Sequence, residues 1–156
     1  DWDHWNPRIR ATLLFVVRDD QVLLIRKKRG IGMGKINGPG GKIDPGETLL
    51  ECAVRETHEE VGLHALGARE VGRLWFQFVD GLSIHCTVFR ADDCTGEVVE
   101  TPEAEPLWTP VNALPFDEMW DDDRHWLPHL LKGRTFELWA TFDDEVMLDH
   151  RLEVGA

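Results

Sequence analysis

The chain has 156 residues, a length that fits one domain around one hydrophobic core. Its formal net charge of -12 argues against binding to long nucleic acid, which proteins hold with basic patches. No apolar run reaches the ~20 residues of a membrane-spanning helix, so the sequence predicts no membrane partner. The three cysteines show no C-x-x-C spacing, which argues against a zinc site and favours reduced thiols in a cytoplasmic protein.

The first half of the chain contains two predicted strands, a glycine-rich segment and a helix. The strands cover residues 10–17 and 22–25, and Asp19-Asp20 between them indicates a hairpin turn. Seven glycines between residues 30 and 46 predict an irregular loop with close backbone approaches. A capping-box pattern at Thr48-x-x-Glu51 starts the helix and Gly62 ends it. Its predicted apolar face consists of Leu50, Ala53, Val54, Thr57 and Val61.

The second half contains strands and one further helix. Strands are predicted at residues 74–79 and 83–89 around the turn signal Asp80-Gly81, followed by an acidic loop over residues 97–106. A short strand starts at Trp108, and a second helix starts between Asp122 and Arg124. Two strands near residues 136–142 and 146–152 complete an α/β (α+β) fold, a mixed sheet flanked by helices. We expect one domain over residues 1–156, with residues 1–8 as an N-terminal extension.

Three carboxylates share one arc of the first helix. At ~100° per residue, Glu56, Glu59 and Glu60 lie within about 100° of each other, away from the apolar face. Like charges at this spacing repel each other. One interpretation is a solvated acidic face with Arg55 nearby. The other is a site for Mg²⁺ or Mn²⁺, which prefer oxygen ligands.

The segment that precedes this helix favours the metal site. Gly41-Lys-Ile-Asp-Pro-Gly-Glu47, seven further residues and then Arg55-Glu-Thr-His-Glu-Glu-Val-Gly-Leu63 resemble the Nudix box, G-x5-E-x7-R-E-U-x-E-E-x-G-U, where U is aliphatic. Eight of its nine positions match, and Thr57 stands where an aliphatic residue is usual. The resemblance implies a Nudix hydrolase, with a mixed sheet between helices and Mg²⁺ as cofactor, Mn²⁺ being the alternative.

The resemblance also assigns roles within the box. The implied metal ligands are Glu56, Glu59, Glu60 and the carbonyl of Gly40. Glu47 and Arg55 are expected to form a salt bridge that orients the helix. A carboxylate from a later loop completes the site in many family members. Glu103 is our choice for it, with Glu100 and Glu105 as competitors.

Three further stretches of the sequence indicate one group within this family. Residues 27–42, 72–79 and 114–128 resemble the oxidised purine nucleoside triphosphate diphosphatases, the MutT-like group that cleaves 8-oxo-dGTP. This resemblance implies hydrolysis of a damaged purine nucleoside triphosphate to the monophosphate and pyrophosphate, which protects DNA by cleaning the nucleotide pool. The implied substrate-binding residues are Thr12, Lys27, Asn37, Gly40, Gly41, Lys42, Phe76, Phe78, Trp120, Asp122 and Asp123.

The chemistry of the acidic pair suits an oxidised purine. Oxidation at C8 places a proton on N7, which a carboxylate can accept, and two close carboxyl groups can share a proton. The resemblance implies that Asn37, Asp122 and Asp123 bind the polar edge of the base, and that Trp120 and Phe76 or Phe78 line the base pocket. Simpler interpretations exist: acids at a helix N-terminus, phenylalanines in a core, a turn asparagine and a surface lysine.

The sequence departs from the group at several positions, and it leaves other functions open. Ile31, Ile36 and Pro39 stand where bulky aromatic residues are expected, which puts the base preference in doubt more than the reaction. Alternative substrates are unmodified nucleoside triphosphates, dinucleoside polyphosphates and ADP-ribose. A non-catalytic nucleotide-binding module is a further alternative, whereas RNA cap removal is disfavoured because no basic strip is visible. The expected partner is a small nucleotide, and we expect a monomer.

Overall fold

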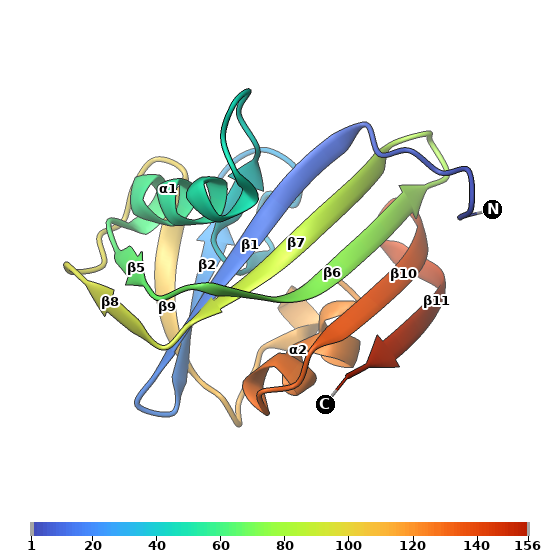
Figure 1. Cartoon of the computed structure of the whole chain (residues 1–156). Helices are drawn as coiled ribbons and strands as arrows, with labels where there is room; N and C mark the ends of the chain where they lie inside the picture. The colour runs from blue at the N-terminus through green and yellow to red at the C-terminus, as the bar shows by residue number, and fades with distance from the viewer. Residues whose placement is uncertain (1, 156) are drawn as a thin grey trace.

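The first two strands are buried on both sides, which determines the layered architecture. In β1 (Ile9–Arg18), Leu14, Phe15 and Val16 are all fully buried although neighbouring side chains in a strand point to opposite faces. Phe15 packs into one apolar cluster and Leu14 and Val16 into another. The single core expected from chain length is thus divided by the sheet into two, each covered by one helix (Figure 1).

The computed structural model describes residues 2–155, and within them nine strands form one mixed sheet. The path of the sheet is β11-β10-β6-β7-β1-β2-β3, with β4 paired to β1 and β9 paired to β2. The remaining strands of this sheet are β2 (Gln21–Lys27), β3 (Ile36–Asn37), β4 (Gly40–Lys42), β6 (Arg69–Phe78), β7 (Ser83–Ala91), β9 (Ala104–Pro110), β10 (Phe136–Asp143) and β11 (Val146–Val154). The short strands β5 (His64–Leu66) and β8 (Asp93–Thr95) form a separate pair. The mixed sheet between helices is the fold that the sequence predicted.

The helix α1 (Leu49–Val61) begins and ends as its sequence indicates. The Thr48 hydroxyl accepts from the Glu51 N–H and the Glu51 carboxylate accepts from the Thr48 N–H, which completes the capping box. Gly62 ends the helix at φ 81°. The predicted apolar face is partly wrong: Leu50 is 44% exposed, whereas Glu60, placed on the polar arc, is 4% exposed. Ala53, Thr57 and Val61 are buried as predicted, together with Cys52.

The helix α2 (Asp123–Leu131) covers the opposite face of the sheet, behind β6 and β10 (Figure 1). Trp126, Leu127 and Leu130 are buried in the cluster that contains Phe15. A short 3-10 helix, η1 (Phe116–Glu118), leads into it. No helix within residues 2–155 has the length and apolar character of a membrane span.

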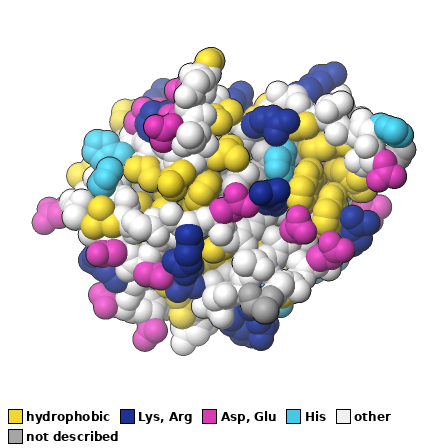
Figure 2. Space-filling view, viewed as in Figure 1, with side chains coloured by type: hydrophobic (Ala, Val, Ile, Leu, Met, Phe, Trp, Pro, Cys, Tyr) yellow, Lys and Arg dark blue, Asp and Glu magenta, His cyan; other side chains and the backbone are white. Residues whose placement is uncertain are grey.

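On the outer face of β6, β7, β10 and β11, three stacked rings and one guanidinium group form a row that we call the aromatic ladder. Its members are His85, Trp75, Trp139 and Arg151. Trp75 and Trp139 stack with centroids 4.7 Å apart, and His85 stacks on the other side of Trp75 at 4.8 Å. The Arg151 guanidinium covers the free side of Trp139 at 4.1 Å. Apolar side chains gather on this face over β6 and β10 in Figure 2.

Several boundaries differ from the sequence-based prediction. The strand near Trp108 begins earlier, at Ala104, because its backbone pairs with β2 over the register from Lys27 to Gln21. The loop predicted over residues 97–106 therefore loses its last three residues. Two strands, β3 and β4, lie inside the glycine-rich segment, and β6 starts at Arg69 rather than Leu74. The turns at Asp19-Asp20 and Gly81 are present, with φ values of 54°, 60° and 103°.

Candidate active site

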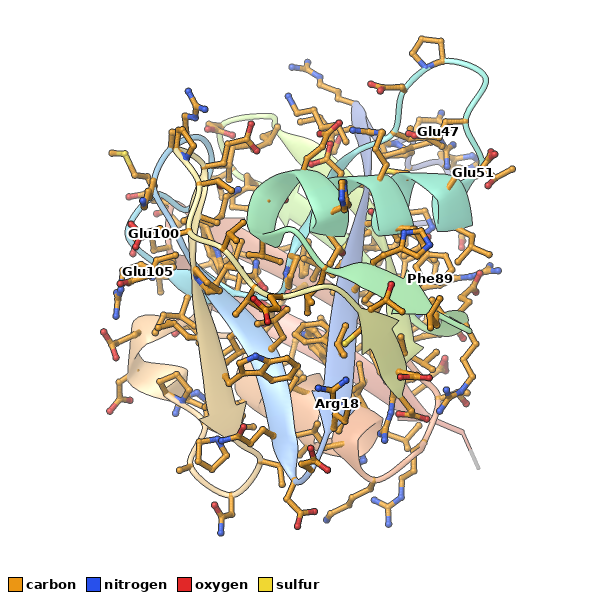
Figure 3. The ribbon with its side chains drawn as sticks, turned by 90° about the vertical axis from the view of Figure 1, so that its left-hand side faces the viewer. Arg18, Glu47, Glu51, Phe89, Glu100 and Glu105 are labelled. Carbon is orange, nitrogen blue, oxygen red and sulfur yellow. The ribbon has the colours of Figure 1, made fainter. Side chains whose placement is uncertain are left out.

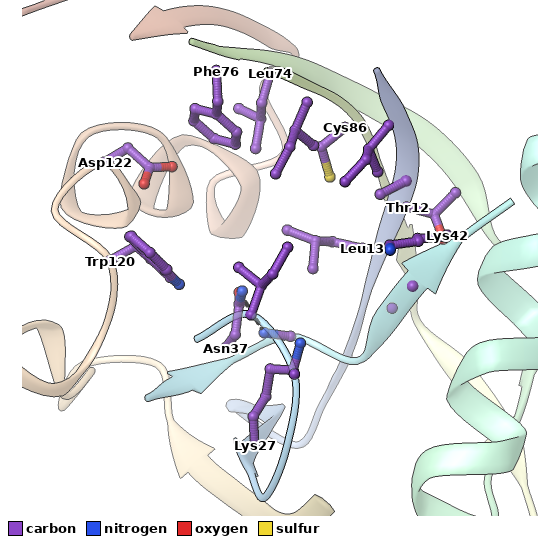
Figure 4. Close-up of a pocket in the computed structure, with 18 of the residues that line it drawn as sticks. Thr12, Leu13, Lys27, Asn37, Lys42, Leu74, Phe76, Cys86, Trp120 and Asp122 are labelled. Carbon is purple, nitrogen blue, oxygen red and sulfur yellow. Dashed lines mark hydrogen bonds between the residues drawn. The ribbon is translucent and has the colours of Figure 1, made fainter. Parts of the chain in front are cut away.

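A cavity of about 370 Å³ opens beside β1, β6 and α2 (Figure 4). It is within the size range of small-molecule sites. The residues predicted to bind substrate all line it: Thr12, Lys27, Asn37, Gly40, Gly41, Lys42, Phe76, Phe78, Trp120, Asp122 and Asp123. Glu60 lines the same cavity, so the predicted base-binding end and the carboxylate helix share one space.

Aromatic rings form one wall of this cavity. The Phe78 and Phe142 rings lie 5.3 Å apart at 25°, and the Trp120 ring meets each of them edge to face at 6.1 and 5.7 Å. The opposite wall is aliphatic and comes from β1 and β7, through Ala11, Leu13 and Ile84. A flat ring system fits between such walls, because aromatic pairs favour stacked and edge-to-face contacts.

Two neighbouring carboxyl groups lie at the aromatic end of the cavity. Asp122 and Asp123 are 3% and 2% exposed. Asp122 Oδ2 accepts a hydrogen bond from Trp126 Nε1 at 2.8 Å, whereas Asp123 Oδ2 is buried with no hydrogen-bond partner among the described residues. Burial raises the pKa of Asp122 to about 6. Burial and the charge of Asp122 raise the pKa of Asp123 well above its usual range. The two carboxyl groups therefore titrate as a pair, and the proton is held more readily than by exposed aspartates.

Asn37 and Thr12, two polar residues that line the cavity, differ in their hydrogen-bond partners. Asn37 faces Asp122 and Trp120 across it (Figure 4), while its Oδ1 accepts from the Gly38 N–H at 2.8 Å, so it also acts in the local turn. Thr12 is 1% exposed, and its hydroxyl contacts Cys52 Sγ at 3.4 Å beneath α1. The Thr12 hydroxyl is therefore engaged inside the protein.

Arg55, in the middle of α1, is the centre of a carboxylate network. Its Nε and Nη2 donate to the two oxygens of Glu47 at 2.6 and 3.0 Å, so the predicted salt bridge is present and bidentate. Its Nη1 donates to Glu56 and Glu59 at 2.8 and 3.1 Å. The hydrogen bonds from Arg55 lower the pKa of Glu47 to about 2. Arg55 thus holds the last turns of the helix against the loop that precedes it.

Glu60 is the most buried of the box carboxylates. Its Oε1 accepts from the Gly40 N–H at 3.1 Å, which fixes the side chain against β4. Burial raises the pKa of Glu60 to about 8, and the charges of Glu56 and Glu103 add to this effect. Burial and the charges of Glu59 and Glu103 likewise raise the pKa of Glu56. The carboxylates are therefore close enough to repel one another.

The three candidates for the late-loop carboxylate have different surroundings. Glu103 is the one whose charge acts on both Glu56 and Glu60. All three lie near a basic side chain: Glu100 forms an ion pair with Lys28, Glu103 lies 3.8 Å from Arg29, and Glu105 lies 4.0 Å from Arg26. Figure 3 shows Glu47 near the amino end of α1 and Glu100 and Glu105 near its other end. The interaction with Glu56 and Glu60 is therefore what favours Glu103.

The donor set fits a hard divalent cation. Within the described part of the chain, no three His, Cys, Asp or Glu side chains are already arranged as a complete ligand set. The cluster nevertheless concentrates carboxylate oxygen atoms around one cation, Arg55, and Mg²⁺ takes few protein ligands while keeping several waters. Gly41 adds space: a Cβ there would lie 2.4 Å from the Glu56 carboxyl carbon, so only glycine lets this carboxylate lie against β4.

Some lining residues were not predicted from the sequence. Phe142 and Cys86 belong to the cavity wall, as do Ala11 and Leu13. Alternation along β1 was the available signal, since residues two apart share a face. Of the three residues that depart from the expected aromatic ones, Ile31 lines the cavity. Ile36 and Pro39 do not: both are buried, Ile36 in the core cluster with Phe15.

Comparisons with known proteins agree with this geometry. A family model described as NUDIX domain matches residues 7–130. The chain is 39% identical over 146 residues to an oxidized purine nucleoside triphosphate hydrolase from Danio rerio, covering 91% of this chain and 92% of that protein. The protein of the same name from Mus musculus is 39% identical over 137 residues, covering 86% of each. A solved structure of a MutT protein from Bacillus halodurans matches with a TM-score of 0.84 at 29% identity, covering 93% of this chain and 97% of that one.

Proposed function

The chain belongs to the NUDIX family, and from this membership we propose that it hydrolyses oxidised purine nucleoside triphosphates such as 8-oxo-dGTP. Water cleaves one phosphoanhydride bond, and the products are the nucleoside monophosphate and pyrophosphate. The observation that carries the proposal is the single cavity that contains both the Asp122/Asp123 pair and Glu60. The base and the phosphates of one nucleotide can therefore contact both ends at once.

The base-binding end supplies recognition. Trp120 and Phe78 contact the purine by stacking on its ring face or by edge-to-face packing. The unpartnered Asp123 Oδ2 accepts a hydrogen bond from the N7–H of an oxidised base when ionised, or donates one to a carbonyl when protonated. Asn37 completes the polar edge from the opposite side. An unmodified guanine presents an acceptor at N7, so it loses one of these hydrogen bonds.

The phosphate end supplies the chemistry. Glu56, Glu59, Glu60, Glu103 and the Gly40 carbonyl are the proposed ligands of Mg²⁺, with Mn²⁺ able to replace it. When bound, the ion neutralises phosphate charge and promotes attack by water. Arg55 and Glu47 orient the helix, while Lys27 and Lys42 face the phosphates. We further propose that residues 1–156 act as one monomeric domain in the cytoplasm, with residues 1–8 as an extension.

The decisive test is kcat/KM for 8-oxo-dGTP beside dGTP in Mg²⁺, followed by pyrophosphate release. We expect a preference of tenfold or more, equivalent to about 1.4 kcal/mol. Asp122→Asn should reduce this preference while turnover of dGTP persists. Equal rates on both nucleotides would overturn the base-recognition proposal and direct the search to dinucleoside polyphosphates and ADP-ribose.

The metal role has its own test. Glu60→Gln keeps a side-chain oxygen that can accept from the Gly40 N–H, so the fold should persist. Turnover of every substrate should fall by about 10²-fold or more, because a ligand charge at the reacting phosphates is lost. Chelation with EDTA should abolish native activity, and Mg²⁺ should restore it. Near-native rates for Glu60→Gln would contradict the assigned role.

A further inference from the structure

The loop between β2 and β3 packs along the edge of Trp120. A Cβ on Gly32 would lie 3.0 Å from Trp120 Nε1, so the loop backbone approaches the ring closely. Gly30, Gly32 and Gly34 all have positive φ, which lets the loop curl back on itself. Lys35 closes the loop: its N–H donates to the Gly32 carbonyl at 2.9 Å, and its carbonyl accepts from the Lys27 N–H at 3.0 Å.

The Lys35 side chain joins three parts of the molecule. Its Nζ lies 5.3 Å from the centre of the Trp120 ring, within the range of a cation–π contact. The same ammonium forms an ion pair with Glu145 at 2.9 Å, in the turn between β10 and β11. The Lys35 side chain is 20% exposed, which reduces screening by solvent. Lys35 does not line the cavity, so it acts on the pocket through Trp120 and through its charge.

The charge of Lys35 reaches the acidic pair. Asp123 is surrounded by Asp122 beside it on the chain, by the Cys86 thiol on β7 and by Lys35 beyond Trp120. Burial and the charge of Asp122 raise the pKa of Asp123, whereas a hydrogen bond with the Trp120 backbone and, to a smaller extent, the charge of Lys35 lower it. Glu145 holds this cation in place without lining the cavity itself.

We propose that Lys35, held by Glu145 against the Trp120 ring, is a positioning residue that orients Trp120 for base recognition. This inference rests on the proposed function and adds a determinant of base selectivity that lies outside the pocket. A cation on the outer side of the ring keeps Trp120 in contact with the β2–β3 loop. The charge of Lys35 also favours the ionised form of Asp123, which accepts a hydrogen bond from the N7–H of an oxidised purine.

The test compares native protein with Lys35→Met, Lys35→Arg and Glu145→Gln, using 8-oxo-dGTP and dGTP across a range of pH. In Lys35→Met we expect KM for 8-oxo-dGTP to rise about three- to tenfold while kcat changes less, because the metal-binding carboxylates are untouched. The pH midpoint of the selectivity ratio should move to higher pH, since removal of a nearby cation raises the pKa of Asp123. Lys35→Arg keeps the charge and should restore both quantities.

Glu145→Gln removes the ion pair that holds Lys35 in place but leaves the positive charge of Lys35. It should raise KM while leaving the pH midpoint near the native value, and its effect on KM should not add to that of Lys35→Met in the double variant. A Lys35→Met protein with native KM and native pH midpoint overturns the inference alone. A native protein without preference for 8-oxo-dGTP overturns the proposed function, and the inference falls with it.

Discussion

At the scale of single residues, burial decides the chemistry of the acidic pair. Asp122 and Asp123 are almost fully buried at the start of α2, where a helix N-terminus would ordinarily favour ionised acids. Desolvation is the largest cause of the raised pKa values of both groups, and the hydrogen bond from Trp126 only partly offsets it for Asp122. The pair therefore keeps protons at pH values where exposed aspartates have lost them.

This burial predicts how stability depends on pH. The pKa of Asp122 is about 6 in the folded protein and near 3.8 when unfolded. The folded state then binds more protons across this window, so the stabilisation present below pH 4 is lost as pH rises through 6. Native protein should lose on the order of 1–3 kcal/mol more unfolding free energy between pH 4 and pH 7 than Asp122→Asn.

Urea unfolding at both pH values measures this difference. Asparagine can still accept from Trp126 Nε1, so the variant keeps the local hydrogen bond. The fully exposed Asp117 provides the control: Asp117→Asn should show the native pH dependence. The same dependence in Asp122→Asn as in native protein would mean that Asp122 is not the group responsible.

At the scale of elements, the site depends on how closely β4 approaches α1. The Gly40 and Gly41 backbone pairs with β1 and lies under the carboxylates of the helix. A Cβ on Gly40 would lie 1.9 Å from the Thr12 carbonyl oxygen, a rigid neighbour, whereas a Cβ on Gly41 would meet only the flexible end of Glu56. The two glycines are therefore required for different reasons.

Gly41→Ala should separate activity from stability. The methyl group displaces the Glu56 carboxylate, and displacement by about 1 Å can cost 10²-fold in rate, so we expect kcat to fall at least tenfold. Stability should change little, because the Glu56 side chain can rotate away. Gly40→Ala should instead lower the melting temperature strongly. Pyrophosphate release and thermal unfolding of both variants test this pair, and a Gly41→Ala protein with native kcat would contradict it.

At the scale of the whole molecule, the carboxyl-terminal hairpin completes the fold and the pocket together. The family model ends at residue 130, yet β10 contributes Phe142 to the cavity and Trp139 to the aromatic ladder. The ladder runs over the outer face of the sheet, from β7 across β6 and β10 to β11. It fastens the hairpin to the rest of the sheet on the side away from the pocket.

Trp139→Ala tests this fastening. Loss of the stacked ring should lower the free energy of unfolding by about 1–3 kcal/mol, since area burial and stacking are both lost. Native kcat/KM should persist at temperatures where the variant is folded. Arg151→Ala, which removes only the cation over the ring, should cost less, about 0.5–1 kcal/mol. Equal losses for both variants would show that the indole stack itself stabilises nothing.

The sequence by itself determined the local secondary structure and the spacing of the carboxylates on α1. The α1 caps, the hairpin turns and the spacing of Glu56, Glu59 and Glu60 follow from short-range rules, because helix geometry fixes which residues are neighbours. Motif resemblance added the remaining proposed site residues, including Asn37 and Trp120, which line the cavity and which no periodicity singles out. The limits of β9 and the strands β3 and β4 were missed, because pairing with distant strands decides them.

Only the tertiary structure decided which groups are buried together. Helical periodicity placed Glu60 on an exposed arc and Leu50 in the core, but β4 covers one side of α1 and leaves the other open. The orphan oxygen of Asp123, the Lys35–Trp120–Glu145 contact and the contribution of Phe142 each join residues far apart in sequence. Desolvation and charge act through space, so their effects appear only when the sheet brings these segments together.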